Sequence, residues 1–205
     1  MLLKNLFRTL AEYKLNLITI VFFELLYLIK GYKGNKFNFN KNDLMADDIP
    51  CPYHFLIKIK KTLKKNNFNK LLDLGCGSGR IIDFFDKNFP NKDYIGIEYF
   101  PSQYNYSKKI FQNRENIKIV QADFTKTDFF KYDPDCYFFN NPFKKDLECI
   151  EFIEKTINFS LNKKKILFIF INVNKKVIEN LRNIQCIESY YIKETKGFSI
   201  CCLNT

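Results

Sequence analysis

The stretch LLDLGCGSGR, residues 71–80, decides the fold. It begins with a short apolar run, typical of a buried strand, and it ends where a helical pattern starts. Between them lie Gly75, Gly77 and Gly79, spaced G-x-G-x-G. Glycines at such a turn allow backbone angles that other residues avoid, so a ligand can come close to the main chain. The helix N-terminus that follows would offer free N–H groups to an anionic group.

Strands and helices alternate on both sides of this turn. Apolar runs predict strands over 69–75, 92–100, 116–123, 135–140 and 164–173. Helical spacing predicts helices over 52–67, 80–89, 102–114, 145–161 and 174–183. Pro101 and a capping Ser102 are expected to open the helix over 102–114. The pattern predicts an α/β domain whose parallel sheet has helices on both faces, closed by an antiparallel pair over 184–193 and 197–203.

The chain is expected to divide into an N-terminal helical extension with a loop, residues 1–50, and one domain over 51–205. The run LNLITIVFFELLYLI, residues 15–29, is short of the roughly 20 residues that span a bilayer, and it contains Asn16 and Glu24. We therefore expect a helix that packs on the domain. Contact with a membrane surface stays open, because Lys30, Lys33 and Lys36 follow directly. Residues 31–50 are interpreted as a connecting loop.

Composition narrows the class of protein. With 46% hydrophobic and 27% charged residues, the chain is typical of a globular protein, which we expect to be monomeric. The net charge of +11 would suit nucleic acid, but the lysines are spread along the chain, so this partner is weakly supported. Seven cysteines without a CxxC pair indicate a reducing, cytoplasmic setting, either free or peripheral to a membrane. His54 is the only histidine, which excludes a His triad and a multi-His metal site, and we expect no metal.

Polar residues stand at the ends of four successive predicted strands. Asp73 lies at the end of the first, Glu98 at the end of the second and Asp123 at the end of the third. The fourth ends in Asn140 and Asn141. Open α/β sheets bind ligands beyond the carboxyl ends of their strands, so these groups predict one binding site. A carboxylate placed like Glu98 can accept hydrogen bonds from a ribose diol.

With DLGCGSG (73–79), GIE (96–98), QAD (121–123) and NNPF (140–143), the chain resembles the class I S-adenosylmethionine-dependent methyltransferases over about 69–203. The resemblance implies a Rossmann-like, seven-stranded sheet of order 3-2-1-4-5-7-6 with the last strand antiparallel. It implies that Asp73 and the glycine turn hold the methionine part of the donor, Glu98 the ribose and Asp123 the adenine amine. The expected cofactor-binding residues are Asp73, Gly75, Cys76, Gly77, Gly79, Glu98, Tyr99, Asp123 and Phe124. A nicotinamide enzyme would more often show G-x-G-x-x-G.

The turn NNPF departs from the family's usual pattern. In members that methylate amines, an Asn or Asp is followed by two prolines and an aromatic residue, and the polar group accepts hydrogen bonds from the target amine. Here either Asn140 or Asn141 takes that role, and Asn141 with Pro142 and Phe143 resembles the N-P-F turn of small bacterial members. Phe143 is equally interpreted as an acceptor clamp or as core. The acceptor is expected to be a nitrogen of a protein, a nucleic acid or a small molecule. The alternative is an inactive nucleoside-binding protein of the same fold, for which association with a membrane surface stays open.

Overall fold

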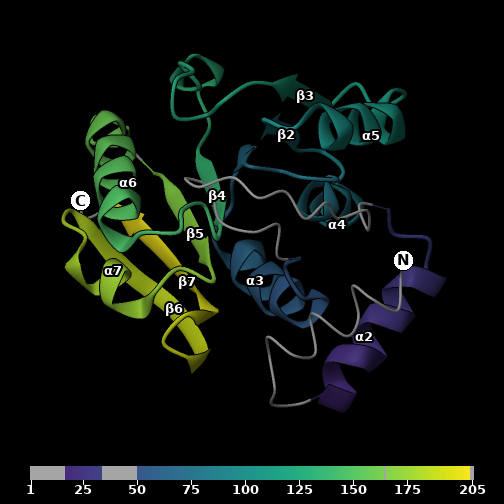
Figure 1. Ribbon diagram of the computed structural model, residues 1–205, viewed down its shortest axis with the longest axis horizontal. Helices are drawn as coiled ribbons and strands as arrows, with labels where there is room; N and C mark the ends of the chain where they lie inside the picture. The colour runs from purple at the N-terminus through teal and green to yellow at the C-terminus, as the bar shows by residue number, and fades with distance from the viewer. Residues whose placement is uncertain (1–16, 34–49, 164, 204–205) are drawn as a thin grey trace.

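The computed structural model describes residues 17–33, 50–163 and 165–203 (Figure 1). The predicted loop over 31–50 therefore lies mostly outside the described residues. The helices are α2 (Leu17–Ile29), α3 (Tyr53–Lys65), α4 (Arg80–Asn88), α5 (Pro101–Phe111), α6 (Asp146–Ser160) and α7 (Lys175–Asn180). The strands are β1 (Lys70–Leu74), β2 (Asp93–Glu98), β3 (Ile117–Gln121), β4 (Cys136–Asn140), β5 (Leu167–Ile171), β6 (Ile184–Lys193) and β7 (Lys196–Leu203). A short 3-10 helix, η1 (Phe130–Tyr132), was not predicted.

The seven strands form one sheet of order β3-β2-β1-β4-β5-β7-β6. Strands β1 to β5 pair in parallel, and β7 lies antiparallel between β5 and β6. This confirms the Rossmann-like order and the antiparallel closing pair. Because the order reverses beside β1, the carboxyl ends of β1 and β4 diverge there and leave room for a ligand.

The apolar strands account for the two cores. Along β4 and β5, alternate side chains point to opposite faces, so a continuous apolar run fills both. On one face Phe138 and Ile169 pack with α3 and α4. On the other face Tyr137, Phe139 and Phe168 pack with α6 and α7. Figure 1 shows α3 and α4 on one side of the sheet and α6 and α7 on the other.

Helix α2 packs on the domain, as expected for a segment of its length. Its buried side chains include Ile20 and Tyr27, and the Tyr27 ring stacks on Tyr53 of α3 with 4.5 Å between ring centroids. Glu24 faces inward and forms an ion pair with Arg80, with 3.0 Å between Oε2 and Nη1. No helix within the described ranges is long and apolar enough to cross a bilayer.

The predicted cap of α5 is wrong. Its N-cap is Phe100, which has extended backbone angles and makes no side-chain cap, and Pro101 is the first helical residue. Pro starts a helix without help from a cap, because it has no N–H to satisfy and its φ is already helical. Ser102 therefore lies inside the first turn. By contrast α7 is capped by Asn174, whose Oδ1 accepts a hydrogen bond from the N–H of Lys176 at 3.1 Å.

Candidate active site

The turn after β1 takes the conformation that its glycines predict. Gly75, Gly77 and Gly79 have φ angles of 80°, 54° and 82°, in the left-handed region where a side chain is strained. At Gly79 a Cβ would also lie 2.5 Å from the ring of Phe111. The glycines therefore serve both the turn and the close packing of α5 behind it. Arg80 begins α4 directly after this turn.

Glu98, at the end of β2, stabilises the glycine turn by accepting hydrogen bonds. Its Oε2 accepts a hydrogen bond from the N–H of Gly77 at 2.8 Å, and its Oε1 accepts one from the N–H of Phe100 at 2.7 Å. The side chain is buried. A carboxylate oxygen can accept more than one hydrogen bond, so holding the turn is compatible with a role of Glu98 toward hydroxyl groups.

Asp73 is the side chain whose environment most clearly indicates a bound ligand. Its side chain is fully buried, and among the described residues neither carboxylate oxygen has a hydrogen-bond partner. Burial holds the pKa of Asp73 well above its ordinary value, and the nearby Glu98 raises it further. A buried carboxyl group without a partner costs free energy, which a cationic group bound beside it would recover. The methionine ammonium of S-adenosylmethionine is such a group, so Asp73 fits this cofactor.

The other predicted cofactor residues lie around the same edge. Phe124 is buried and its ring would lie 3.8 Å from a Cβ on Gly75. Cys76 is a buried free thiol in the glycine turn, and Tyr99 is exposed after β2. Asp123 Oδ1 accepts hydrogen bonds from the N–H and the hydroxyl of Thr125 at 3.0 and 2.6 Å. Asp123 therefore shapes its own turn, and its role toward adenine stays a prediction.

The ends of β4 and β5 meet in a polar turn region. Asn141 and Asn172 follow these strands with φ angles of 49° and 55°. The N–H of Asn141 donates to the carbonyl of Ile171 at 2.8 Å, and the N–H of Asn172 donates to Gly197 at 2.9 Å. These bonds tie both turns to the neighbouring strand. The side chain of Asn172 also donates to Asn140 Oδ1 at 3.4 Å.

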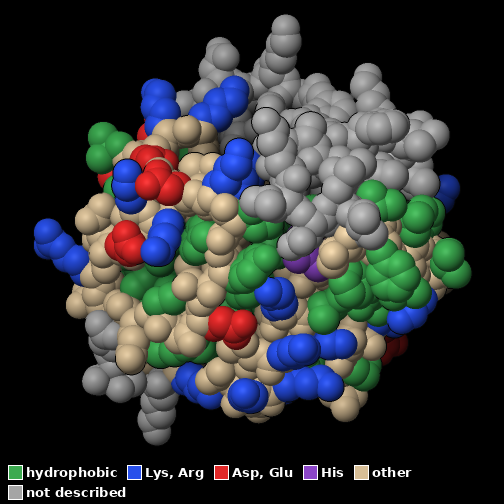
Figure 2. All heavy atoms as spheres, turned by 90° about the horizontal axis from the view of Figure 1, so that it is seen from below, with side chains coloured by type: hydrophobic (Ala, Val, Ile, Leu, Met, Phe, Trp, Pro, Cys, Tyr) green, Lys and Arg blue, Asp and Glu red, His purple; other side chains and the backbone are tan. Residues whose placement is uncertain are grey.

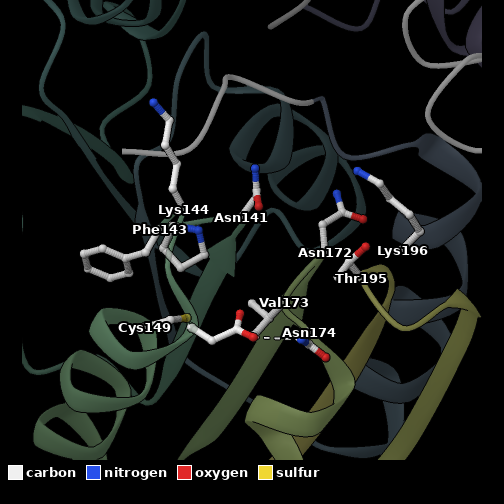
Figure 3. Close-up of a pocket in the computed structure, with 11 residues that line it drawn as sticks. Asn141, Phe143, Lys144, Cys149, Asn172, Val173, Asn174, Thr195 and Lys196 are labelled. Atoms are coloured by element: carbon white, nitrogen blue, oxygen red, sulfur yellow. Dashed lines mark hydrogen bonds between the residues drawn. The ribbon is translucent and has the colours of Figure 1, made fainter. Parts of the chain in front are cut away.

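A pocket of about 220 Å³ opens at this place. Its lining includes Asn141 but not Asn140, which favours Asn141 as the residue that meets an acceptor. Figure 3 shows the Asn141 and Asn172 side chains rising from the ends of β4 and β5 on the same side of the pocket. The lining residues are Asn141, Pro142, Phe143, Lys144, Asp146, Cys149, Asn172, Val173, Asn174, Thr195 and Lys196.

Phe143 is partly buried and packs against the core beside the turn. Its ring centroid lies 5.8 Å from that of Phe124 and 5.4 Å from that of Phe152. In Figure 3 the ring points away from Asn141. These contacts join the acceptor turn to the aromatic side chains beside the glycine turn. They favour the core interpretation of Phe143, and its role as an acceptor clamp stays a prediction.

Sequence reasoning missed part of the pocket. Asn172 follows β5 as Asn140 and Asn141 follow β4, so the strand-end argument could have found it. Asp146 and Asn174 lie at the starts of α6 and α7 and are joined by a hydrogen bond of 2.8 Å. Lys196 comes from the β6–β7 hairpin, and no local sequence pattern predicts that this hairpin turn lies near the end of β5.

The single histidine is placed outside this pocket. His54 is the second residue of α3, and its Nδ1 is buried without a hydrogen-bond partner in the described part of the chain. Burial lowers the pKa of His54 to about 4, and Lys58 acts in the same direction. His54 is therefore neutral near pH 7. Among the described residues, no group of three or more His, Cys, Asp or Glu side chains could hold a metal ion.

Comparison with known proteins gives one family and many solved structures. Residues 71–155 match the family described as a methyltransferase domain. A protein from Staphylococcus aureus described as a caffeoyl-CoA O-methyltransferase is 15% identical, with a TM-score of 0.58 over 76% of this chain and 85% of its own. The methyltransferase domain of bacterial CtHen1-C is 16% identical, with a TM-score of 0.54 over 73% of this chain and 95% of its own.

A third structure was solved with a natively bound methyl donor. Fibrillarin from Aeropyrum pernix, in complex with S-adenosyl-L-methionine, is 14% identical, with a TM-score of 0.52 over 65% of this chain and 66% of its own. At these identities the likeness establishes the fold and leaves the acceptor open. Comparison with curated protein sequences found no match.

Proposed function

Because this chain carries a class I, Rossmann-like methyltransferase domain, we propose that it transfers a methyl group from S-adenosylmethionine to a nitrogen atom of an acceptor bound beside Asn141. The observation that carries the proposal is the buried carboxyl group of Asp73, which has no hydrogen-bond partner among the residues that the structure describes. On the same sheet edge a polar pocket presents Asn141.

Three side chains would hold the donor. Asp73 would pair with its ammonium group, and its pKa would fall as the pair forms, since an opposite charge favours the ionised form. Glu98, whose carboxylate already holds the N–H groups of Gly77 and Phe100, would accept the ribose hydroxyls. Asp123 would meet the adenine amine from the end of β3. When bound, S-adenosylmethionine supplies a methyl group on a positively charged sulfur, which is a good leaving group.

The acceptor side of the site would act by positioning the nitrogen atom that receives the methyl group. The amide oxygen of Asn141 can accept a hydrogen bond from an N–H group and so aim the nitrogen lone pair. Two backbone hydrogen bonds fix the turns that carry Asn141 and Asn172, so the points from which their side chains project are set before an acceptor binds. A neutral amine needs no general base, so this chemistry does not require a histidine in the pocket.

Calorimetry with S-adenosylhomocysteine tests the donor site first. The wild-type protein should bind, and Asp73→Asn should bind about 10- to 100-fold more weakly, because a hydrogen-bonded charge pair is lost. Glu179→Gln, on the exposed surface of α7, is the matched control and should bind like the wild type. A wild-type protein that binds neither the donor nor its product contradicts the proposal.

Transfer is tested with a radiolabelled methyl donor and fractionated lysate. Label should appear in protein, RNA or small molecules, and the fraction identifies the acceptor class. Asn141→Ala should abolish transfer and keep product binding, while Asn180→Ala on exposed α7 should keep both. If the protein binds the donor but labels no fraction, the function is that of a nucleoside-binding protein without turnover.

A further inference from the structure

Helix α2 buries one face and leaves an apolar face in solvent. Phe22, Leu25 and Ile29 are 58%, 44% and 82% exposed, and Leu28 beside them is also exposed. Positions 22, 25 and 29 are three and four residues apart, so they share one face of the helix. We call this set of four side chains the α2 apolar stripe. Ion pairing of the inward Glu24 with Arg80 fixes the orientation of the helix, so the stripe must face outward.

A group of lysines borders the stripe. Lys30 directly follows α2, and Lys60, Lys61 and Lys64 belong to α3, against which α2 packs. Lys61 and Lys64 are exposed, and Lys60 is half-buried with its Nζ donating to Asn88 Oδ1 at 3.2 Å. Lys60 and Lys61 precede Lys64 by four and three residues, so the three cations share one side of α3. Burial lowers the pKa of Lys60, and the charges of Lys64, Lys30 and Lys61 lower it further, so all four cations act on one another. We call them the basic cluster. Figure 2 shows a patch of hydrophobic side chains at the right of the molecule with Lys and Arg side chains along its lower border.

We propose that the α2 apolar stripe and the basic cluster bind the surface of a membrane that contains anionic phospholipids. An interfacial helix places its apolar side chains among the acyl chains and its cations at the headgroups, which is the arrangement found here. Thirteen helical residues extend about 20 Å, so α2 would lie in the plane of the surface rather than cross it.

Charge argues against the other occupants of this face. A second copy of the chain would use the same patch on both partners and bring two basic clusters together, which is repulsive. Nucleic acid would satisfy the lysines but would leave the apolar stripe in water, because phosphate contacts need no such stripe. An anionic lipid surface offers negative headgroups to the basic cluster and acyl chains to the α2 apolar stripe. This inference does not depend on the proposed methyl transfer, and its test uses no methyl donor.

The test is co-sedimentation of the full chain with vesicles. Phosphatidylcholine vesicles with added phosphatidylglycerol should bind the protein, and vesicles of phosphatidylcholine alone should bind it much more weakly. The variant Lys60→Gln/Lys61→Gln/Lys64→Gln should lose about 100-fold in partitioning, since each lysine near such a surface contributes on the order of a factor of five. The variant Phe22→Ser/Leu25→Ser/Ile29→Ser should lose at least about tenfold.

Matched variants remove the same groups from other faces. Lys108→Gln/Lys109→Gln/Lys131→Gln has the same charge as the lysine variant, and Leu147→Ser/Leu161→Ser/Ile187→Ser removes exposed apolar side chains elsewhere. Both should bind vesicles like the wild type, and circular dichroism should show that all variants are folded. The proposal is overturned if the wild type does not bind anionic vesicles, or if the control variants lose as much binding. A dimer that the stripe variant dissociates, without vesicle binding, would also overturn it and would assign the face to self-association.

Discussion

Replacing Glu24 with Ala should destabilise the whole domain, although Glu24 lies in the N-terminal extension. The Arg80 and Glu24 side chains are only 8% and 12% exposed, and their charged atoms lie 3.0 Å apart. Arg80 also donates to the carbonyl of Cys51 at 3.1 Å and lies over the Tyr53 ring. Burial opposes the charge of Arg80, but Glu24, Tyr53 and Cys51 together outweigh it and raise the pKa of Arg80. Without Glu24 the guanidinium would stay buried with its charge uncompensated.

The magnitude follows from that burial. Removal of one partner from a buried ion pair typically costs about 3–5 kcal/mol, whereas an exposed pair is worth about 1 kcal/mol or less. Glu24 also accepts a hydrogen bond from the first N–H of α3, on Tyr53, at 3.3 Å, so its loss removes a helix cap as well. Urea unfolding followed by circular dichroism measures the free energy of unfolding at neutral pH.

Two further variants separate charge from packing. Glu24→Gln keeps one oxygen, which can still accept from Arg80 Nη1 and the N–H of Tyr53, and should cost less than Glu24→Ala. The double variant Glu24→Met/Arg80→Met replaces the pair with apolar groups of similar size and should recover most of the loss. If Glu24→Ala costs less than about 1 kcal/mol, the pair behaves like a surface pair and the docking of α2 described above is refuted.

Three other predictions concern single titratable groups. Asp73→Asn should stabilise the ligand-free protein increasingly as pH rises above 3.8. Burial raises the pKa of Asp73, so ionisation of this group favours the unfolded chain, and Asn removes that effect. Urea unfolding across pH checks this, and a free-energy difference between variant and wild type that does not change with pH would contradict it. Wild-type stability should fall by up to about 3 kcal/mol as pH drops from 6.5 to about 4, because the unfolded chain protonates His54 before the native state does; His54→Phe should remove that part of the pH dependence. Cys186 is exposed, and a hydrogen bond with Cys201 lowers its pKa to about 6, so iodoacetamide should modify it first at neutral pH; peptide mass mapping that finds another cysteine modified first would refute this.

Local patterns predicted the elements, and a rule about parallel sheets predicted where their ends meet. The glycine spacing in 71–80 and the apolar runs of β4 and β5 are patterns among residues close together in the chain. These patterns predicted the α/β fold. Glu98 and Asp73 followed from the position of strand ends. Each of these inferences uses information carried within one strand, one helix or one turn.

Contacts between distant segments were beyond that reasoning. Glu24 and Arg80 are 56 positions apart, and nothing in the apolar run over 15–29 indicates that its one carboxylate will turn inward. The hairpin residue Lys196 reaches the pocket only because β7 inserts between β5 and β6. The cap of α5 failed for a local reason, since Pro101 started the helix without needing Ser102. Tertiary packing, rather than propensity, decided the first two cases.

The Glu24–Arg80 pair also bears on the donor site. Arg80, Glu24 and Asp73 all lie close enough to Cys51 to act on its thiol: burial raises the pKa of Cys51, Arg80 lowers it, and Glu24 and Asp73 raise it further. Arg80 is not among the groups that shift the pKa of Asp73, which responds to burial and to Glu98. While Glu24 neutralises Arg80, Asp73 therefore keeps its carboxyl group for a cationic ligand.

Loss of Glu24 should change which charges act near Asp73. In Glu24→Ala the uncompensated charge of Arg80, which acts on the same Cys51 thiol as Asp73, would oppose binding of the donor's ammonium group beside Asp73. We expect Glu24→Ala to bind S-adenosylhomocysteine at least about tenfold more weakly, even at temperatures where it is fully folded. Glu24→Met/Arg80→Met, which has no cation to compete, should bind like the wild type. Equal affinity in the wild type and Glu24→Ala would show that the extension stabilises the domain without acting on its ligand site.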